Sequence, residues 1–543
     1  MISFCNIAST MEAQAHLRPF QRAVVFPHGR DSLGRIAWTH LTCSDLNRLT
    51  DEFARGFDDL DMRDERVFLL LGPSLEWLPV VFALFKVGAV PILTDTNLSR
   101  SATLSCLERT TPRVLIAPPL VHAWRRLYSR SFKSVEIPVT IGDNTWFWGG
   151  STLQQCRVVG DEPFPTMVTT PEDEAAIVFT SGTTGPPKAV SCTHGFFDQS
   201  MRQLQQMYGI QPGEIELASM PLFALLAIAM GMTVVLPGSD LSQPNQTEVG
   251  KIVEVIQTQG CSSSFGGPTL WSRIGRWCHE REVHLNSLRR IVITGARVPI
   301  AMHKVFRGVL GPGRQIHTLY GNTECLAISS IGSEEALGET ALVTNRSVET
   351  CLGHPLPLIK VGVIKIVEGE IECWSDELLL STGEIGEIVL EDSPMIAPYL
   401  GETRSTSIPD GESAFHRTGD LGYLDGEHRL WFCGRKSNLV VTKNGERLFP
   451  VPCEAIFDAH PDVRRTALVG VDGEPRLVVE LQPPIRRDRD DIAAELLALG
   501  QANPLTIEVK QIHFHPKLPL DVHHRAKIHR LELAAWAKKQ SRS

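Results

Sequence analysis

The residues best suited to chemistry form a short polar loop that follows an apolar run. Residues 175–179 are apolar and predict a buried strand. The next nine residues, 180–188, contain two glycines, four hydroxyl side chains and a lysine. Glycines let backbone N–H groups turn toward one point, hydroxyls add donors and a lysine adds positive charge, so this combination suits a polyphosphate. The predicted phosphate contacts are Thr180, Ser181, Gly182, Thr183, Thr184, Gly185 and Lys188.

The spacing in this loop differs from that of the common phosphate-binding loop, GxxxxGK followed by Ser or Thr. Gly182 lies six residues before Lys188, and Ala189 follows the lysine. The alternative interpretation is an ordinary polar turn that leads out of a strand. The density of glycines, hydroxyls and positive charge favours phosphate binding over that alternative.

The same loop carries a resemblance to a known family. TSGTTGPPK resembles the signature of the adenylate-forming superfamily, which includes acyl-CoA synthetases, luciferases and the adenylation domains of peptide synthetases. Five motifs occur in the family's order, and the resemblance covers the chain from about Asn6 to Trp536. It implies that ATP binds with its triphosphate on this loop and that Lys188 is a catalytic residue.

HTLYGNTE, residues 317–324, is the second motif. The resemblance implies that Tyr320 stacks on adenine, that Thr323 binds the α-phosphate and that Glu324 holds Mg²⁺. These roles fit the side chains, because an aromatic face suits a purine and a carboxylate is a hard oxygen ligand. The alternative is a strand end followed by a solvated glutamate. The nucleotide contacts implied in this motif are Tyr320, Gly321, Asn322 and Thr323.

Two further segments complete the implied nucleotide site. The turn at Gly295 and Ala296 is similar to the adenine-contacting turn of the family, although Arg297 stands where a small residue is usual. Asp420, in HRTGD, would accept hydrogen bonds from both ribose hydroxyls, and Arg435 would touch the ribose. A lone Thr-Gly-Asp also makes a good turn, and only its place in the order of motifs makes it informative.

The last motif, HRAKIHR at residues 524–530, is similar to the family's terminal lysine motif. Lys527 is therefore the implied catalytic lysine, and the alternative is a surface lysine in a basic tail. We expect a domain boundary after Arg435. Residues 1–435 would form an AMP-binding adenylation domain, and residues 436–543 a mobile C-terminal domain that carries Lys527. Ser437 occupies the implied hinge, where Asp or Lys is usual.

The elements that position these motifs alternate along the chain. In residues 66–95 an apolar strand is followed by Ser74 as a candidate helix cap, an apolar helix and a second strand. Such alternation predicts parallel sheets with helices on both faces. The resemblance implies an α/β fold: a large N-terminal domain of two Rossmann-like α/β subdomains and a small β-subdomain that includes Tyr399, with a small mobile α+β C-terminal domain. We expect residues 118–170 to be connecting structure.

Composition narrows the class of protein. A chain of 543 residues is long enough for two or more domains, and a formal charge of −9 argues against nucleic acid as a partner. The twelve cysteines are scattered without CxxC pairs, which favours reduced, buried thiols in a cytoplasmic protein. The first ten residues have no basic region leading into an apolar core, so we expect no secretion signal. The apolar run at residues 220–236 is interrupted by Gly231, and we expect a buried helix and strand rather than a transmembrane segment.

The implied reaction is the activation of a carboxylic acid, with ATP and Mg²⁺ as cofactors, to acyl-AMP and pyrophosphate. Phe223 and Ala224 would border the acyl pocket, and Ala224 stands where acyl-CoA synthetases commonly carry a histidine. With FALFKVGAVPILTD, RLWFCGRK and HHRAKIHR, this departure makes the chain most similar to the β-lactone synthetases of bacterial olefin biosynthesis. The substrate would then be a long-chain 3-hydroxy acid whose own hydroxyl displaces AMP.

Two alternative functions stay open. The first is a fatty acyl-CoA or acyl-carrier-protein ligase, because Gly445 occupies the flexible turn that lines the pantetheine tunnel in such enzymes. The second is a non-catalytic scaffold relative, against which the retained catalytic set argues. That set is Lys188, Glu324, Asp420 and Lys527. The expected partners are a small carboxylic acid and other enzymes of the same pathway. No base for the hydroxyl is assigned among His194, His317 and His354.

Overall fold

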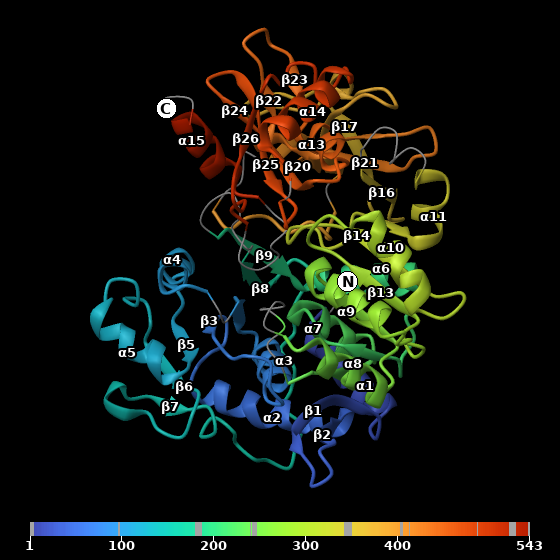
Figure 1. Ribbon diagram of the computed structural model, residues 1–543. Coiled ribbons are helices and arrows are strands. Elements are labelled where there is room, and N and C mark those ends of the chain that lie inside the picture. The colour runs from blue at the N-terminus through green and yellow to red at the C-terminus, as the bar shows by residue number, and fades with distance from the viewer. Residues whose placement is uncertain are drawn as a thin grey trace.

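The computed structural model describes residues 5–95, 98–179, 187–238, 241, 247–341, 350–391, 393–401, 406–411, 413–485, 487–520 and 528–540. Figure 1 shows the blue and green elements of the N-terminal part packed together in the lower half, with the orange and red elements of the C-terminal part above them. The alternation of strands and helices expected for an α/β fold is confirmed.

One sheet has seven strands in the order β7-β6-β5-β3-β4-β8-β9. Neighbouring strands are parallel except at β8 and β9, which pair antiparallel. The central strands β3, β4 and β5 are short, almost fully buried apolar runs. They are β3 (Arg66–Leu69), β4 (Val90–Leu93), β5 (Val114–Ala117), β6 (Ile137–Thr140), β7 (Ser151–Thr152), β8 (Glu174–Phe179) and β9 (Ala189–Thr193).

Two expectations in this region were wrong. Ser74 does not cap a helix: α3 begins at Trp77 with Glu76 at its cap position, and the Ser74 hydroxyl has no partner among the described residues. Every residue of α3 (Trp77–Val87) is buried, so packing rather than capping stabilises this helix. Residues 118–170 also hold more than connecting structure, since they supply α5 (Pro119–Leu127), β6 and β7 to the edge of the sheet.

The second sheet has fourteen strands, with β17-β18-β20-β21-β16-β15-β14-β13-β12-β10-β11-β1-β2 in order and β19 on β20. From β1 across to β14 the neighbours are parallel, and beyond β14 they are antiparallel. The parallel part comprises β1 (Arg22–Arg30), β10 (Ile215–Leu217), β11 (Thr233–Val235), β12 (Ser263–Gly266), β13 (Arg290–Ile293) and β14 (Gln315–Tyr320), with β2 (Ile36–Thr42) antiparallel at the edge.

The expected β-rich region continues this same sheet rather than forming a separate one. Its strands follow β14 through antiparallel pairs, so β14 and β20 belong to one sheet. These strands are β15 (Ser329–Gly332), β16 (Thr350–Pro355), β17 (Val361–Ile364), β18 (Gly386–Glu391), β19 (Ser407–Asp410), β20 (Ser413–Leu424) and β21 (Leu430–Arg435).

Helices cover the sheets and fill the space between them. The predicted helix near residues 194–207 is confirmed as α6 (His194–Tyr208), and the apolar run forms α7 (Pro221–Ala229) leading into β11, as expected. The other helices of this part are α1 (Ile7–Leu17), α2 (Cys43–Asp59), α4 (Arg100–Thr110), α8 (Val249–Gln259), α9 (Pro268–Glu280), α10 (Ile300–Val309) and α11 (Ser333–Leu337). Among the described residues, no helix has the length and hydropathy needed to cross a membrane.

The last hundred residues form a third sheet with its own apolar core. Its strands are ordered β24-β25-β26, and a two-stranded ladder of β22 and β23 lies beside it. The elements are β22 (Val440–Val441), β23 (Arg447–Leu448), α13 (Pro450–Asp458), β24 (Val463–Val471), β25 (Glu474–Leu481), α14 (Arg489–Gln501), β26 (Gln511–Phe514) and α15 (Arg530–Gln540). Leu468 and Phe457 are at the centre of this core and are fully buried.

The cysteines are packed inside the molecule. All twelve are free thiols, and ten of them are buried, which confirms the expected burial. Burial raises the pKa of several of these thiols, for example that of Cys106 to about 12, so they stay protonated and act as small apolar side chains.

Candidate active site

Two of the predicted catalytic segments lie outside the described residues: Thr180, Ser181, Gly182, Thr183, Thr184 and Gly185 of the phosphate loop, and Lys527. The elements that flank the loop are described. β8 ends at Phe179, and Lys188 immediately precedes β9, so the ends of the loop are fixed by an antiparallel pair of strands.

Three of the predicted nucleotide residues meet in one cluster. Asp420 on β20 lies opposite Arg435 on β21 in the ladder, and Arg435 Nε is 2.8 Å from Asp420 Oδ1. The Tyr320 hydroxyl, at the end of β14, donates a hydrogen bond of 2.6 Å to Asp420 Oδ2. Asp420 is only 2% exposed, so the positive charge of Arg435 and the hydrogen bond from Tyr320 compensate a buried charge.

The charges of this cluster determine which of its groups donate and which accept hydrogen bonds. Burial and then the negative charge of Asp420 raise the pKa of Tyr320 well above its ordinary value, so the phenol keeps its proton and donates. Asp420 likewise raises the pKa of Arg435. An ionised carboxylate has about four lone-pair sites. The two contacts therefore leave Asp420 with accepting capacity for the two hydroxyls of a ribose.

A tight turn after β14 positions Glu324. The side chain of Asn322 accepts a hydrogen bond of 2.7 Å from the Cys325 N–H, and the Asn322 N–H donates to the Cys325 carbonyl at 2.9 Å. At Gly321 a Cβ would lie 2.3 Å from the carbonyl oxygen of Leu326, so only glycine fits. Asn322 and Gly321 therefore shape the turn through its own backbone.

Glu324 is a buried carboxylate, 5% exposed, at the end of this turn. Burial raises its pKa, and the positive charges of Arg435 and Lys188 oppose that rise. Within the described part of the chain, no group of three or more metal-binding side chains gathers. A single hard carboxylate fits Mg²⁺, which takes most of its ligands from water and substrate phosphates. Glu324 could hold such an ion through its carboxylate.

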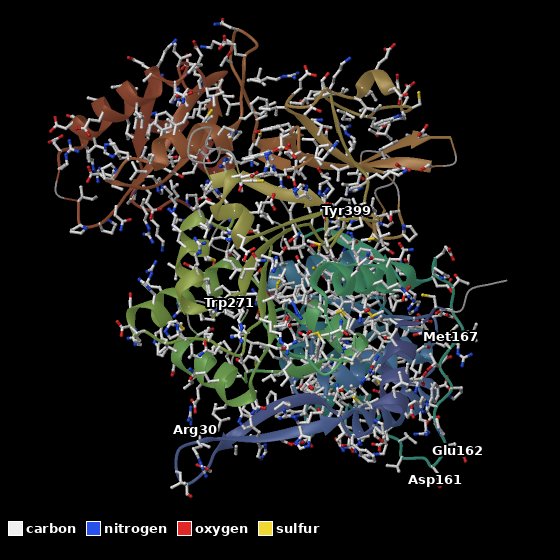
Figure 2. All side chains as sticks on the ribbon, turned by 90° about the vertical axis from the view of Figure 1, so that its right-hand side faces the viewer. Arg30, Asp161, Glu162, Met167, Trp271 and Tyr399 are labelled. Atoms are coloured by element: carbon white, nitrogen blue, oxygen red, sulfur yellow. The ribbon has the colours of Figure 1, made fainter. Side chains whose placement is uncertain are left out.

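Lys188 is positioned by a contact that joins two sheets. Its Nζ lies 4.4 Å from the centre of the Tyr399 ring, within the range of a cation–π interaction. The Tyr399 segment pairs with β9 through a bridge to Val190 and a 2.9 Å bond from Ser191 N–H to the Pro398 carbonyl. Figure 2 shows Tyr399 at the junction of the upper and lower parts of the molecule. The sequence motifs assign no role to Tyr399, because the residue that it contacts, Lys188, lies about two hundred residues earlier in the chain.

The predicted adenine turn follows β13 and lies beside the end of β14. Gly295 has φ of +90°, a conformation that favours glycine. Because β13 and β14 are parallel neighbours, their carboxyl ends share one edge, which places Ala296 and Tyr320 at that edge. Arg297 is exposed. Burial raises the pKa of Asp458 on α13 to about 6 and the charge of Arg297 opposes this rise, so the arginine faces the C-terminal elements.

The two predicted pocket residues lie on the buried face of α7. Phe223 stacks on Phe265 of β12, with ring centres 4.5 Å apart and planes 7° from parallel. Tyr208 of α6 lies edge-on to both Phe265, at 6.0 Å, and His317 of β14, at 5.2 Å. We call these four side chains, Phe223, Phe265, Tyr208 and His317, the aromatic row. It runs from α7 to β14, and Ala224 lies beside its first ring with 1% exposure.

The candidate histidines occupy three different environments. His194 Nδ1 accepts a hydrogen bond of 3.2 Å from the Ile7 N–H, and burial lowers the pKa of His194 to about 4. His354 is half exposed and lies 3.3 Å from a carboxylate oxygen of Glu335. Burial, and then Arg290, lower the pKa of His317 to about 4. His194 is thus committed to α1 and His354 to a surface contact, which leaves His317, a neutral imidazole within the aromatic row.

The predicted hinge follows the last strand of the second sheet. Ser437 is exposed in a single turn, Lys436–Asn438. The preceding Lys436 is anchored, with Nζ 3.2 Å from Glu387 Oε2. Gly445 lies farther along, in the exposed turn between β22 and β23, with φ of +84°.

The fold agrees with the comparisons with known proteins. The chain belongs to the AMP-binding enzyme family, whose profile matches residues 11–400. It is 35% identical to an olefin β-lactone synthetase of Xanthomonas campestris pv. campestris, over 99% of this chain and 99% of that protein.

Solved structures give the same fold over the whole chain. ATP-bound MatB from Rhodopseudomonas palustris superposes with a TM-score of 0.79 at 19% identity, covering 99% of this chain and 100% of that chain. The O-succinylbenzoate coenzyme A synthetase of Bacillus subtilis, solved with ATP and a magnesium ion, superposes with a TM-score of 0.74 at 21% identity, covering 96% and 98%.

Proposed function

We propose that the chain activates a 3-hydroxy carboxylic acid with ATP and closes the activated acid to a β-lactone. The observation that carries the first half is the cluster of Tyr320 and Arg435 around the buried carboxylate of Asp420, beside Glu324. The second half is supported by the 35% identity to an olefin β-lactone synthetase over nearly the full chain and by Ala224 at the wall of the apolar region.

In the first step a carboxylate oxygen of the acid attacks the α-phosphorus of ATP, and the bond from that phosphorus to pyrophosphate breaks. Asp420 would accept the ribose hydroxyls, and Tyr320 would lie under the adenine. Glu324 and Lys188 would counter the charge that develops on the phosphate oxygens, together with Lys527 and the hydroxyls of the 180–185 loop. Ala296 and Thr323 would border the nucleotide.

In the second step the 3-hydroxyl oxygen attacks the acyl carbon. The bond between that carbon and the AMP oxygen breaks, AMP leaves with the electron pair and the hydroxyl proton passes to a phosphate oxygen of AMP or to water. No external nucleophile is needed, because the hydroxyl is held next to the acyl carbon in the same molecule. The aromatic row would cover the chain near the reacting atoms and limit access of water.

A long apolar acid fits this wall better than a polar one. Phe223 and Ala224 are buried among apolar side chains of α7, and the row continues over Phe265 to Tyr208. An apolar chain gains free energy in proportion to the apolar area that it removes from water. The proposed substrate class is therefore the long-chain 3-hydroxy acids.

We further propose that residues 1–435 and 436–543 act as two domains that reorient about Ser437 between the two steps. This arrangement would bring Lys527 to the α-phosphate in the first step and remove it in the second. Mg²⁺ as the accompanying ion, a cytoplasmic location and assembly with enzymes that make the hydroxy acid or consume the lactone belong to the same proposal.

Thioester formation is the competing second step, and the exposed glycine turn at Gly445 would be compatible with it. One assay separates the two. Pyrophosphate release is followed with a long-chain 3-hydroxy acid and with the same acid lacking the hydroxyl, each with and without coenzyme A. Multiple turnovers with the hydroxy acid alone support lactone closure. Turnover that requires coenzyme A would contradict it.

A further inference from the structure

A pocket on the far side of the seven-stranded sheet is unrelated to the nucleotide cluster. It has a volume of about 290 Å³ and lies under α5, with one wall from the turn Trp146–Trp148. The lining residues are His122, Arg125, Arg126, Ser129, Phe132 and Trp148. In the order of the sheet, β6 and β7 are at one edge and β9, next to Lys188, is at the other. Figure 1 shows α5 at the side of the molecule away from α10.

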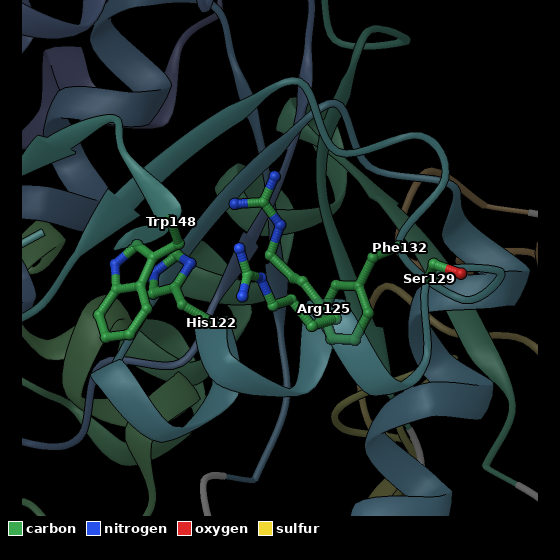
Figure 3. Close-up of a pocket in the computed structure, with 6 residues that line it drawn as sticks. His122, Arg125, Ser129, Phe132 and Trp148 are labelled. Atoms are coloured by element: carbon green, nitrogen blue, oxygen red, sulfur yellow. The ribbon is translucent and has the colours of Figure 1, made fainter. Parts of the chain in front are cut away.

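Among the described residues that line the pocket, two are arginines and none carries a carboxylate. Arg125 Nη1 is a buried atom that has no hydrogen-bond partner among the described residues. Burial lowers the pKa of Arg125, and no acidic group opposes that effect. The guanidinium of Arg126 is exposed and lies 4.7 Å from the centre of the Phe147 ring. Figure 3 shows the Arg125 side chain between Trp148 and His122 on one side and Phe132 and Ser129 on the other.

The walls of the pocket are rigid. Trp148 stacks on His122, with ring centres 5.9 Å apart, and its indole N–H donates a 2.9 Å hydrogen bond to Thr140 Oγ1. His122 is 1% exposed and its Nε2–H donates to the Val139 carbonyl at 3.0 Å. Phe132 is 4% exposed on the opposite wall. The arginines are therefore held over a preformed space rather than over a surface that can collapse onto them.

Arg125 is half-buried, with Nη1 as its buried atom, and Arg126 is exposed. A buried donor without a hydrogen-bond partner is costly, and an anion normally compensates such a group. A guanidinium offers a planar set of donors that matches the oxygens of a phosphate. The local sequence also concentrates positive charge, since LYSRSFK follows the two arginines in a chain with a formal charge of −9. We propose that this pocket, the α5 anion pocket, binds a phosphate group through Arg125 and Arg126.

Two sources could supply that phosphate. One is a free phosphate or small phosphate ester. The other is the headgroup of an anionic phospholipid, because exposed apolar side chains surround the pocket on the same elements. They are Leu120, Leu127, Trp146 and Phe147. The chemistry of recognition is the same in both cases, and the two sources are distinguished by experiment.

The test uses the full chain at low ionic strength with two probes: inorganic phosphate in calorimetry, and vesicles of phosphatidylcholine with or without phosphatidylglycerol in a sedimentation assay. Arg125→Ala should weaken binding of at least one probe by about tenfold to a hundredfold, since a charge-assisted contact is lost. The exposed Arg307 on α10 gives the matched control, and Arg307→Ala should bind as the wild type does. Adenylation should be unchanged in both variants.

Arg125→Lys serves as a second variant, because it keeps the charge and removes the planar fork; it should fold normally and bind at an intermediate level. Loss of phosphate binding assigns a soluble ligand, and loss of vesicle binding alone assigns a lipid headgroup. Equal binding by wild type and Arg125→Ala in both assays would overturn the proposal. Absence of binding to either probe by the wild type would do so as well.

Discussion

Tyr320 and Asp420, one hundred positions apart in the chain, are joined by a hydrogen bond of 2.6 Å. Their strands are not neighbours, because β15, β16 and β21 lie between β14 and β20 in the sheet. The side chains therefore meet across the end of the sheet, beyond the intervening strands. In the proposed enzyme this contact couples the residue under the adenine to the residue that holds the ribose.

Tyr320→Phe tests that coupling. The substitution keeps an aromatic face for the purine and removes the donor to Asp420, so the buried carboxylate retains only Arg435. We expect ATP to bind about tenfold more weakly, which corresponds to loss of one hydrogen bond to a charged group. Calorimetry with ATP measures the effect. An unchanged dissociation constant would show that the contact does not prepare Asp420 for ribose.

Glu324→Gln tests the magnesium site through pH. Burial raises the pKa of Glu324, and a protonated carboxyl is a poor ligand for Mg²⁺. The affinity of the wild type for Mg²⁺ in the presence of ATP should therefore fall as pH falls through the raised pKa, by about tenfold for each pH unit below it. Glu324→Gln should bind Mg²⁺ weakly at every pH. A pH-independent wild type would contradict the assignment.

The same shift predicts a change in the stability of the protein without nucleotide. Because the pKa of Glu324 in the folded protein is above its ordinary value, its contribution to stability is fully present at acid pH and is lost as pH rises through the raised pKa. Without Mg²⁺ or ATP, Glu324→Gln should thus have a higher unfolding temperature than the wild type at neutral pH. The difference should disappear at acid pH. A lower unfolding temperature for Glu324→Gln than for the wild type at neutral pH would be evidence against a destabilising buried carboxylate.

Lys188→Ala should abolish most of the adenylation activity while leaving the fold intact. Loss of a single preorganised positive group at a developing oxyanion reduces kcat by about a hundredfold to a thousandfold. ATP–pyrophosphate exchange measures the reduction. Lys304, exposed on α10, provides a matched control, and Lys304→Ala should exchange at the wild-type rate. Comparable exchange rates in Lys188→Ala and Lys304→Ala would show that Lys188 does not contribute to adenylation.

Much of the nucleotide cluster was predictable from the sequence because each motif lies within or directly after a strand of one sheet. Asp420, Arg435, Tyr320 and Glu324 are separated by long stretches, yet their order along the chain was enough to place them at one site. Their chemistry is local: a carboxylate, a phenol or a guanidinium has the same preferences wherever the fold puts it. The antiparallel strands from β14 to β21 determine how these residues lie relative to one another, which the motifs alone do not specify.

Other parts depended on contacts that leave no local pattern. Tyr399 reaches Lys188 only because its segment pairs with the edge strand β9. Phe265 and Tyr208 belong to the aromatic row through packing of three elements. Ser74 has the residue type of a helix cap, but the buried helix α3 starts three residues later. In each case tertiary packing outweighs the local preference of the side chain.

Ser437→Pro tests the proposed hinge. Proline fixes φ near −65°, so a reorientation about this residue should be impaired while a preformed ATP site is not. We expect turnover to fall by about tenfold or more with little change in the dissociation constant of ATP. Ser437→Ala, which keeps the backbone free, should behave as the wild type does. Equal loss of ATP binding and turnover in the proline variant would count against a hinge.

The most direct measurement of the central claim is mass spectrometry of the products formed from ATP and a long-chain 3-hydroxy acid labelled with a heavy oxygen isotope in its carboxylate. No thiol is added. We predict a β-lactone that keeps one labelled oxygen in its carbonyl and AMP that carries the other, since the acid attacks phosphorus first and its own hydroxyl displaces AMP. The matched acid without the hydroxyl should stop as bound acyl-AMP. Unlabelled AMP, or a coenzyme A thioester formed from the plain acid when the thiol is supplied, would contradict the account.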